Sequence, residues 1–200
     1  MVRSKQVIVV GGGASGLMAA GQAAAAGAKV LLVERTTRLG TKLRITGKGR
    51  CTLTNTAELD PFLAHFAFPE PDASSRHFIR NAFARFFSSD LVTFFHDLGV
   101  PTVVERGGRV FPASSDAHEV ADALVRFAKG EGVGVQLRSR VRKLLCAEGR
   151  MEGLVLEDGT SLRARAVVLA TGGASYPRTG STGDGYALAQ SVGPVSYTHL

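Results

Sequence analysis

Short apolar runs flank a helix-forming stretch at the start of the chain. Residues 6–10 and 30–34 are rich in β-branched and aliphatic side chains, which favours strands, and the alanine-dense segment 14–26 between them favours a helix. Several glycines fall in the turn between the first run and the helix. The pattern therefore predicts a βαβ unit with a glycine-rich first turn.

In the middle of the chain the spacing of apolar residues differs from that of the first 34 residues. Residues 39–55 carry glycines and basic residues without a regular period, which predicts a long ordered loop with a short helical piece. Between residues 75 and 98, apolar side chains, mostly Phe, recur at helical spacing in two runs, with Ser88 or Ser89 as the cap between them. This stripe is interpreted as core packing, and the alternative is that it lines a substrate or flavin cavity.

The rest of the chain mixes short strands with one helix. A hairpin is predicted around Gly107-Gly108, and a helix capped by Ser115 or Asp116 follows it to about Lys129. Five further strands are predicted at 134–137, 141–146, 153–157, 161–165 and 166–170. With no repeat and no linker in the pattern, we expect an α/β fold with a parallel central sheet, an antiparallel βββ meander and a Phe-rich helical excursion.

The amino-acid composition excludes several classes of protein. The chain is 44% hydrophobic and 20% charged, so it can bury a core and is not a disordered tail. Its net charge of +7 suits nucleic acid, acidic lipid or a phosphorylated ligand, but the basic residues are scattered, which favours an ordinary solvated surface. Cys51 and Cys146 stand far apart and outside any CxxC pair, which argues against a disulfide framework or a zinc site. We expect no metal and a cytoplasmic location.

The two ends of the chain each invite a second interpretation. A basic start followed by the uncharged residues 6–28 resembles a signal peptide, but the glycines make this run too weakly apolar for a membrane helix, so no membrane partner is expected. The last six residues, Val195-Ser196-Tyr197-Thr198-His199-Leu200, are what GTC TCT TAT ACA CAT CT encodes, the mosaic end of transposon-made sequencing libraries. We expect residues 194–200 to be non-native, which resequencing of the locus tests.

The glycine-rich turn has the pattern GxGxxG. Gly11 permits the tight turn, Gly13 leaves room for a pyrophosphate, and Gly16 lets the helix pack closely on the strand. Ala14 and Ser15 open the helix, whose N-terminus then faces the phosphates. A glycine-rich turn that binds no ligand is the alternative, which the strand before it and the helix after it disfavour.

Glu34 ends the second predicted strand 23 residues after Gly11, near the usual spacing of the ribose-binding acid. Its carboxylate would bind the adenosine ribose and repel a 2′-phosphate, so FAD or NAD is expected rather than NADP. Arg35 beside it joins the expected cofactor site. The meander, followed by Ala170-Thr171-Gly172-Gly173 after the last strand, resembles the Rossmann-like FAD-binding domain of glutathione-reductase type, in which that strand returns beside the first.

Four segments carry a closer resemblance over residues 7–193. Segments 11–17, 40–55, 108–112 and 170–185 resemble the bacterial NAD(P)/FAD-dependent oxidoreductases, also labelled aminoacetone oxidase family FAD-binding enzymes. The loop of that family reads GRK…SG.GRCN.TN, so Thr41 stands in place of an Arg and Thr52 in place of an Asn, which weakens any role for position 52. The run 176–186 resembles the family's SYP.TGSTGDGY and the TGDG of succinate dehydrogenase flavoproteins.

The resemblance implies a cofactor site beyond the glycine-rich turn. Arg50 would neutralise pyrophosphate or form a surface salt bridge, and Cys51 would be a redox thiol or a small buried residue, the latter being favoured because no second cysteine is near. Asp184 would cap the next helix or organise the cofactor. The further residues that the resemblance places at FAD are Lys42, Gly49, Asn55, Val141 through its backbone, Thr171, Gly172 and Gly173.

The resemblance also implies a function. The intact protein is expected to be a flavoprotein oxidoreductase that acts on a small molecule with FAD, and NAD(P)H is a candidate transient electron donor. In that family a substrate-side domain and a returning FAD segment follow, so residues 1–193 are expected to be an incomplete domain that binds FAD weakly or not at all and is inactive alone. An FAD-dependent RNA-modifying protein, supported only by the basic charge, and a non-catalytic dinucleotide-binding module remain as alternatives. Neither the oligomeric state nor catalytic residues follow from the sequence.

Overall fold

The computed structural model describes residues 6–66 and 73–193, which form two compact units. Unit 1 contains the chain up to Arg44 and again from Leu124, and unit 2 contains residues 45–123. The residues expected to be non-native, 194–200, lie outside the described residues. None of the helices in the described ranges is long and apolar enough to cross a membrane.

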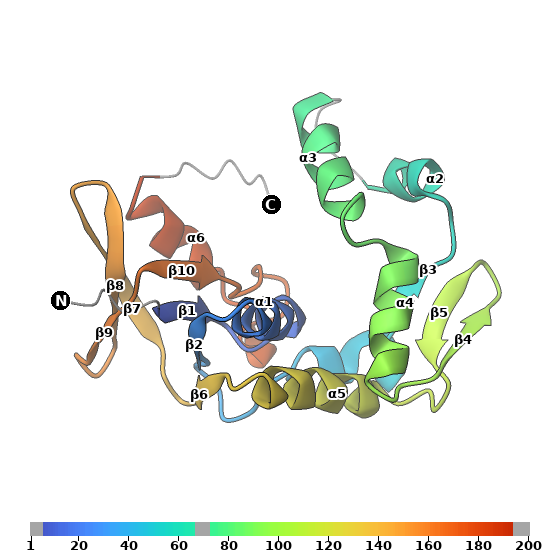
Figure 1. The fold of residues 1–200 in the computed structure, drawn as a ribbon, viewed down its shortest axis with the longest axis horizontal. Helices are drawn as coiled ribbons and strands as arrows, with labels where there is room; N and C mark the ends of the chain where they lie inside the picture. Colours follow the sequence, from blue (N-terminus) through green and yellow to red (C-terminus); the bar gives the residue numbers. More distant parts are fainter. Residues whose placement is uncertain (1–5, 67–72, 194–200) are drawn as a thin grey trace. The chain divides into compact units, whose positions relative to one another are not determined.

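A four-stranded parallel sheet forms the centre of unit 1. The predicted βαβ unit is confirmed as β1 (Gln6–Val10), α1 (Ala14–Ala25) and β2 (Lys29–Val33). Two strands from the last third of the chain, β6 (Gly134–Gln136) and β10 (Ala166–Leu169), complete the sheet. The strand order is β10-β1-β2-β6 (Figure 1). Because β10 pairs with β1 in parallel, the carboxyl ends of β1, β2 and β10 lie at one edge of the sheet.

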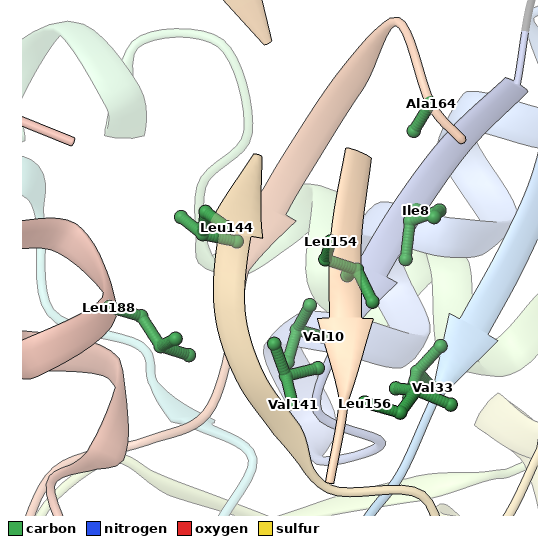
Figure 2. Close-up of a cluster of buried hydrophobic side chains, with 9 residues drawn as sticks. All are labelled: Ile8, Val10, Val33, Val141, Leu144, Leu154, Leu156, Ala164 and Leu188. Atoms are coloured by element: carbon green, nitrogen blue, oxygen red, sulfur yellow. The ribbon is translucent and has the colours of Figure 1, made fainter. Parts of the chain in front are cut away.

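The predicted βββ meander is also confirmed. Its strands are β7 (Val141–Ala147), β8 (Arg150–Leu156) and β9 (Ser161–Arg163), in the antiparallel order β7-β8-β9. Figure 2 shows the meander and the central sheet sharing one apolar cluster, which Leu188 of helix α6 (Asp184–Gln190) joins. Leu154, at the centre of this cluster, is fully buried, and burial of such a side chain stabilises a fold by about 1.5–3 kcal/mol.

Helix α1 packs closely against its neighbours. Leu17 and Ala20 are fully buried. A Cβ added at Gly21 would lie 2.2 Å from a ring carbon of Phe127, in the second half of α5 (Ala117–Gly130). Only glycine therefore allows this approach between the two helices.

Unit 2 contains the helical excursion and a small antiparallel sheet. Its helices are α2 (Leu59–Ala64), α3 (Ala73–Phe83) and α4 (Ser88–Asp97), and its sheet has the order β3-β5-β4, with β3 (Thr54–Asn55), β4 (Thr102–Glu105) and β5 (Arg109–Pro112). A 3-10 segment, η1 (Leu43–Gly49), leads into it. The prediction that Ser88 or Ser89 caps α4 is wrong. Phe87 is the N-cap, and its N–H donates to Asp90 Oδ2 at 2.7 Å.

The Phe-rich stripe only partly packs as a core. Four rings contact one another with centroids 5.3–5.8 Å apart, those of Phe62, Phe66, Phe83 and Phe87. Phe95 is buried, as the core interpretation requires. Phe78 is 77% exposed, however, so that interpretation is wrong for this residue. Helical spacing alone predicts which residues lie on the same face of a helix, but not whether another element covers that face.

Candidate cofactor-binding site

The glycine-rich turn lies at the carboxyl edge of the central sheet, and the fold itself requires two of its glycines. Gly11 has φ +107°, and a Cβ there would lie 2.4 Å from the carbonyl oxygen of Ala170. A Cβ at Gly16 would lie 1.8 Å from the carbonyl oxygen of Gly11. These two positions therefore set the close packing of turn, helix and strand, as their place in the motif predicts.

Gly13 is different, because the protein leaves open space beside it. A Cβ at this position would meet nothing within 4 Å. Gly13 is the N-cap of α1, has extended backbone geometry and makes no side-chain cap, and the first turn of α1 contains no acidic residue. The first N–H groups of a helix lack intrahelical acceptors and carry partial positive charge. The open space and these N–H groups fit a pyrophosphate, which is the group the motif predicts here.

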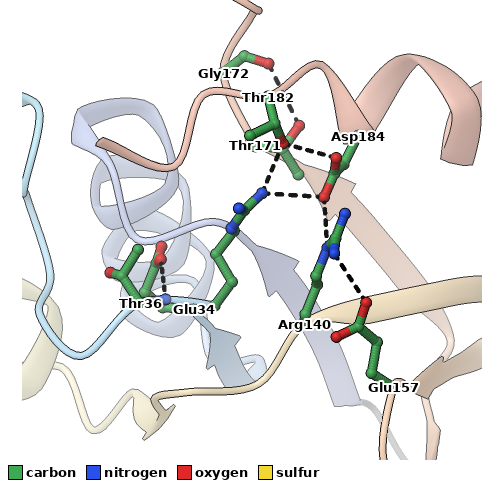
Figure 3. Close-up of polar contacts among 9 residues, drawn as sticks. Glu34, Thr36, Arg140, Glu157, Thr171, Gly172, Thr182 and Asp184 are labelled. Atoms are coloured by element: carbon green, nitrogen blue, oxygen red, sulfur yellow. Dashed lines mark hydrogen bonds and ion pairs between the residues drawn. The ribbon is translucent and has the colours of Figure 1, made fainter. Parts of the chain in front are cut away.

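The Glu34 carboxylate lies beside this turn and is almost fully buried. Its Oε2 accepts a hydrogen bond from the Gly12 N–H at 2.6 Å, and its Oε1 accepts one from the Thr36 N–H at 2.7 Å. Figure 3 shows the contact with Thr36. Each carboxylate oxygen can accept more than one hydrogen bond, so capacity remains for the two hydroxyls of a ribose. The two backbone bonds fix the orientation of the carboxylate before any ligand arrives.

The segment after β10 folds back on itself next to the turn. Gly172 has φ +75°, and the Gly183 N–H donates to the carbonyl oxygen of Gly173 at 3.2 Å. A Cβ at Gly185 would lie 2.1 Å from Oγ1 of Thr171. The ATGG run and the TGDG run are thereby held against each other at the carboxyl edge of the sheet.

Asp184 joins three segments of this edge (Figure 3). It accepts hydrogen bonds from Arg140 Nε at 2.9 Å, from Arg35 at 3.1 Å and from the Thr182 hydroxyl at 2.7 Å. Arg140 also pairs with Glu157 at 3.0 Å. Gly183, not Asp184, is the N-cap of α6, so the capping interpretation of Asp184 is wrong. Its role in the structure is to bind two arginines.

We expect Asp184→Asn to destabilise the protein at neutral pH and to matter less in acid. The hydrogen bond from Arg140, followed by that from Thr182, lowers the pKa of Asp184 below its ordinary value. A carboxyl group with a lowered pKa contributes its full stability above the ordinary pKa, near 3.8, and loses it as the pH falls through the lowered value. Urea unfolding of both proteins at about pH 6 and about pH 3 measures this. A difference that stays undiminished in acid would contradict it.

Lys42 lies on the loop after β2, which contacts the glycine-rich turn. The Gly40 N–H donates to the Gly12 carbonyl oxygen at 2.8 Å, and the Lys42 Nζ donates to the Ser175 hydroxyl at 3.1 Å. The same ammonium lies 5.7 Å from the ring centroid of Tyr176. The loops after β2 and after β10 therefore meet at Lys42.

The predicted residues of unit 2 lie in and around a loop with unusual backbone geometry. Gly47, Lys48, Gly49 and Cys51 all have φ between +56° and +86°. Such values are costly for residues other than glycine and cluster at functional sites. This geometry was not foreseen from the sequence.

Arg50, on this loop, forms a salt bridge, which was the alternative to a contact with pyrophosphate. It binds Glu105 through both of its terminal nitrogens and lies 4.3 Å over the ring of Phe111. The hydrogen bond between them raises the pKa of Arg50 and lowers that of Glu105. The structure thus shows a partner for Arg50, and its predicted contact with pyrophosphate stays a prediction.

The Asn55 side chain is likewise engaged within unit 2. Its Nδ2 donates to the Gly107 carbonyl oxygen at 2.7 Å, and its Oδ1 accepts from the Ala57 N–H at 2.8 Å. The first bond ties Asn55 to the turn between β4 and β5, and the second is local to the chain after β3. The predicted role of Asn55 at ribityl or flavin edges stays a prediction.

We expect Cys51 to resist thiol reagents in the native protein. Its side chain is 2% exposed, and burial raises the pKa of the thiol, whereas Cys146 of β7 is exposed. Since the thiolate is the reactive form, one thiol per chain should react rapidly before unfolding and both after it. Cys146→Ser should abolish the rapid phase, and a rapid phase that survives this substitution would show that Cys51 is reactive.

The predicted site residues divide between the two units. Unit 1 brings most of them to the carboxyl edge of its sheet: Gly11, Gly13, Ala14, Ser15, Gly16, Glu34, Arg35, Lys42, Thr171, Gly172, Gly173 and Asp184. The Val141 side chain is buried in the apolar cluster, which leaves its backbone for the predicted contact. Gly49, Arg50, Cys51 and Asn55 belong to unit 2. Thr36, Arg140 and Thr182 were missed, and of these only Thr182 lies in a motif, as the first residue of the TGDG run.

Comparison with known proteins places this arrangement among dinucleotide-binding proteins. A sequence profile of the HI0933-like protein Rossmann domain matches residues 5–196. The 3-dehydro-bile acid Δ(4,6)-reductase of Clostridium scindens is 37% identical over 167 residues, which is 83% of this chain and 38% of that protein. The ribosomal RNA dihydrouridine synthase of Escherichia coli is 30% identical over 190 residues, which is 93% of this chain and 44% of that protein. The chain thus spans less than half the length of these two relatives.

The fold has a solved counterpart. The 3-ketosteroid-Δ4-(5α)-dehydrogenase of Rhodococcus jostii RHA1, in complex with 4-androstene-3,17-dione, superposes with a TM-score of 0.69 at 22% identity, covering 94% of this chain and 53% of that one. This likeness concerns the fold alone. Together with the family match, it confirms the predicted α/β fold of the FAD-binding Rossmann type with a parallel central sheet.

Proposed function

This chain belongs to the family of the HI0933-like protein Rossmann domain, and on that premise we propose that it is the dinucleotide-binding part of an FAD-dependent oxidoreductase acting on a small molecule. One observation carries the proposal: the open space at Gly13 lies beside the uncapped start of α1, and the oriented Glu34 carboxylate adjoins the same turn. A diphosphate and a ribose need these two environments side by side.

Each part of the turn has a separate task toward the cofactor. The N–H groups of Ala14, Ser15 and Gly16 at the start of α1 bind the pyrophosphate, and Glu34 accepts hydrogen bonds from the adenosine ribose. Lys42 adds positive charge near the phosphates. When bound, FAD supplies the electron transfer, so the chain's own residues bind and orient it.

The proposal extends to the protein as a whole. Because the chain spans less than half of its curated relatives, we propose that residues 1–193 are followed by the substrate-side region and a further segment that contacts FAD. We also propose that the whole protein acts in the cytoplasm, which rests on the two isolated cysteines, and that it takes electrons transiently from NAD(P)H, which rests on the resemblance described above.

The cofactor is tested on protein purified from the complete reading frame without added flavin. Absorption bands near about 370 and about 450 nm that are released on denaturation are the expected result. The absorbance of the flavin released from denatured protein, compared with that of a flavin standard, gives the number of flavins bound per chain. A folded, colourless protein that also fails to take up added FAD would refute the cofactor and favour the non-catalytic module.

A substrate class follows from the relative that is 37% identical, whose name describes the reduction of a 3-dehydro-bile acid. We propose a rigid ring ketone, with its carbonyl conjugated to the reacting carbon–carbon double bond, as the substrate class. Anaerobic mixing of the reduced holoprotein with 4-androstene-3,17-dione tests this class. Reoxidation of the flavin with a stoichiometric loss of the conjugated double bond is the expected result.

An RNA-modifying function is the second candidate. The relative named as a ribosomal RNA dihydrouridine synthase and the net charge of +7 favour it. Filter binding of the holoprotein to ribosomal RNA at several salt concentrations separates the candidates, because contacts to many phosphates give a steep salt dependence. Tight binding with a steep slope would favour RNA, and weak binding favours the small molecule.

A further inference from the structure

Tyr176 displays an aromatic ring at the edge of the sheet where the cofactor site lies. It follows β10 by seven residues and is 58% exposed. Among the described residues its hydroxyl makes no hydrogen bond, so the hydroxyl is available to a ligand. Ligands of open α/β sheets bind beyond the carboxyl ends of the strands, which is where this residue lies.

The backbone of Tyr176 is held firmly although its side chain is exposed. Its carbonyl oxygen accepts hydrogen bonds from the Thr179 N–H at 3.0 Å, the Thr179 hydroxyl at 2.8 Å and the Ser181 N–H at 3.3 Å. Tyr176 and Ser181 also form an antiparallel bridge. A ring on an anchored backbone loses little freedom when it binds a ligand, which favours affinity.

Lys42 determines which parts of the side chain remain available. Its ammonium lies 5.7 Å from the ring centroid and is held there by the Ser175 hydroxyl at 3.1 Å. A cation on the ring draws electron density toward itself, which makes the phenol a better hydrogen-bond donor. The hydroxyl and the part of the ring away from Lys42 are thus suited to a neutral, flat ring that carries a carbonyl oxygen.

We propose that Tyr176 is a specificity-determining residue that binds the conjugated ketone substrate, with its hydroxyl donating to the substrate carbonyl and its ring packing on the flat conjugated portion. This inference rests on the proposed function, because it assigns a residue to the substrate of that reaction. The proposed role of Tyr176 is to bind the substrate, and no chemical step is assigned to it. The loop after β10 thereby serves the cofactor with its glycines and the substrate with Tyr176.

Titration of the flavin absorbance of the oxidised holoprotein with 4-androstene-3,17-dione tests the proposal without turnover. Tyr176→Phe removes the hydroxyl alone and should raise the Kd about 5-fold, as expected for one lost hydrogen bond. Tyr176→Ala removes the ring as well and should raise it about 30-fold. In steady state the Phe variant should raise KM with little change in kcat. Val104→Ala, which shortens an exposed side chain of β4, is the control and should leave the Kd unchanged.

The outcomes separate this inference from the function on which it rests. Wild-type protein without flavin refutes the proposed function. Flavin-loaded wild type that does not bind the ketone, or variants with unchanged Kd, refutes the role of Tyr176 while leaving the cofactor intact. Variants that lose flavin also refute it, because Tyr176 would then serve the cofactor or the fold.

Discussion

The holoprotein with Gly13→Val is expected to lose bound FAD while keeping its fold. The protein leaves open space where the side chain would go, and the backbone at Gly13, with φ −80°, suits any residue. The valine would instead occupy the space of the pyrophosphate, and we expect affinity for FAD to fall about 100-fold or more, near the upper end of what overpacking costs. Stability should fall by no more than about 1 kcal/mol, because valine is a poor N-cap.

Gly16→Val is the matched control for this prediction. A Cβ at Gly16 would lie 1.8 Å from a backbone oxygen, so this substitution should destabilise the fold by about 3 kcal/mol or more. Flavin content after purification and the urea midpoint measure the two effects separately. A Gly13→Val protein that retains its flavin would show that the pyrophosphate lies elsewhere.

Glu34→Ala is expected to weaken FAD binding and to destabilise the protein at once. The ribose would lose a charged acceptor, which should cost about 1–3 kcal/mol of binding free energy, or about 5- to 150-fold in Kd. The Gly12 N–H is buried and would lose its acceptor, which should cost about 1–3 kcal/mol of stability. Fluorescence titration with FAD and urea unfolding measure the two quantities.

Two further variants make this prediction specific. Glu34→Gln keeps an oxygen acceptor but places an amide group where the carboxylate accepted a backbone N–H, so it should recover only part of the loss. Glu157→Ala removes the same charge from an exposed pair with Arg140 and should change stability by less than about 1 kcal/mol. Unchanged FAD affinity in the Glu34→Ala protein would contradict the assignment of the ribose site.

The elements of unit 1 could be predicted because their signals are local. The apolar run 6–10 marks β1, whose last three residues are buried, and the run 166–170 marks β10, which pairs with it in parallel. The expectation that 166–170 is a buried strand is wrong, because Val168 is 37% exposed. Gly11 and Gly16 follow from the same logic, since the closeness of helix and strand allows no Cβ there. The pairing of β10 with β1 was predicted through the resemblance rather than from the apolar run itself.

The remaining parts depend on contacts between distant residues, which no local pattern reveals. Arg140, on the loop before β7, reaches Asp184 of α6, and Asn55 of β3 reaches the Gly107 carbonyl oxygen in the turn between β4 and β5. The exposure of Phe78 depends on what covers α3 and not on its periodicity. Helix α2 was not predicted at all, because it is a six-residue helix with Pro61 in its first turn.

The order of the units along the chain governs how the protein is made. Unit 2 is one continuous stretch of the chain. In unit 1, by contrast, β1 pairs with β10, which is synthesised much later, and Val7 pairs with Ala166. On the ribosome the N-terminal βαβ segment therefore emerges long before one of its neighbouring strands exists. Residues 45–123 can complete their own sheet in that interval. Until β10 emerges, β1 has one open edge, and the nascent chain is then most exposed to mispairing and in need of chaperones.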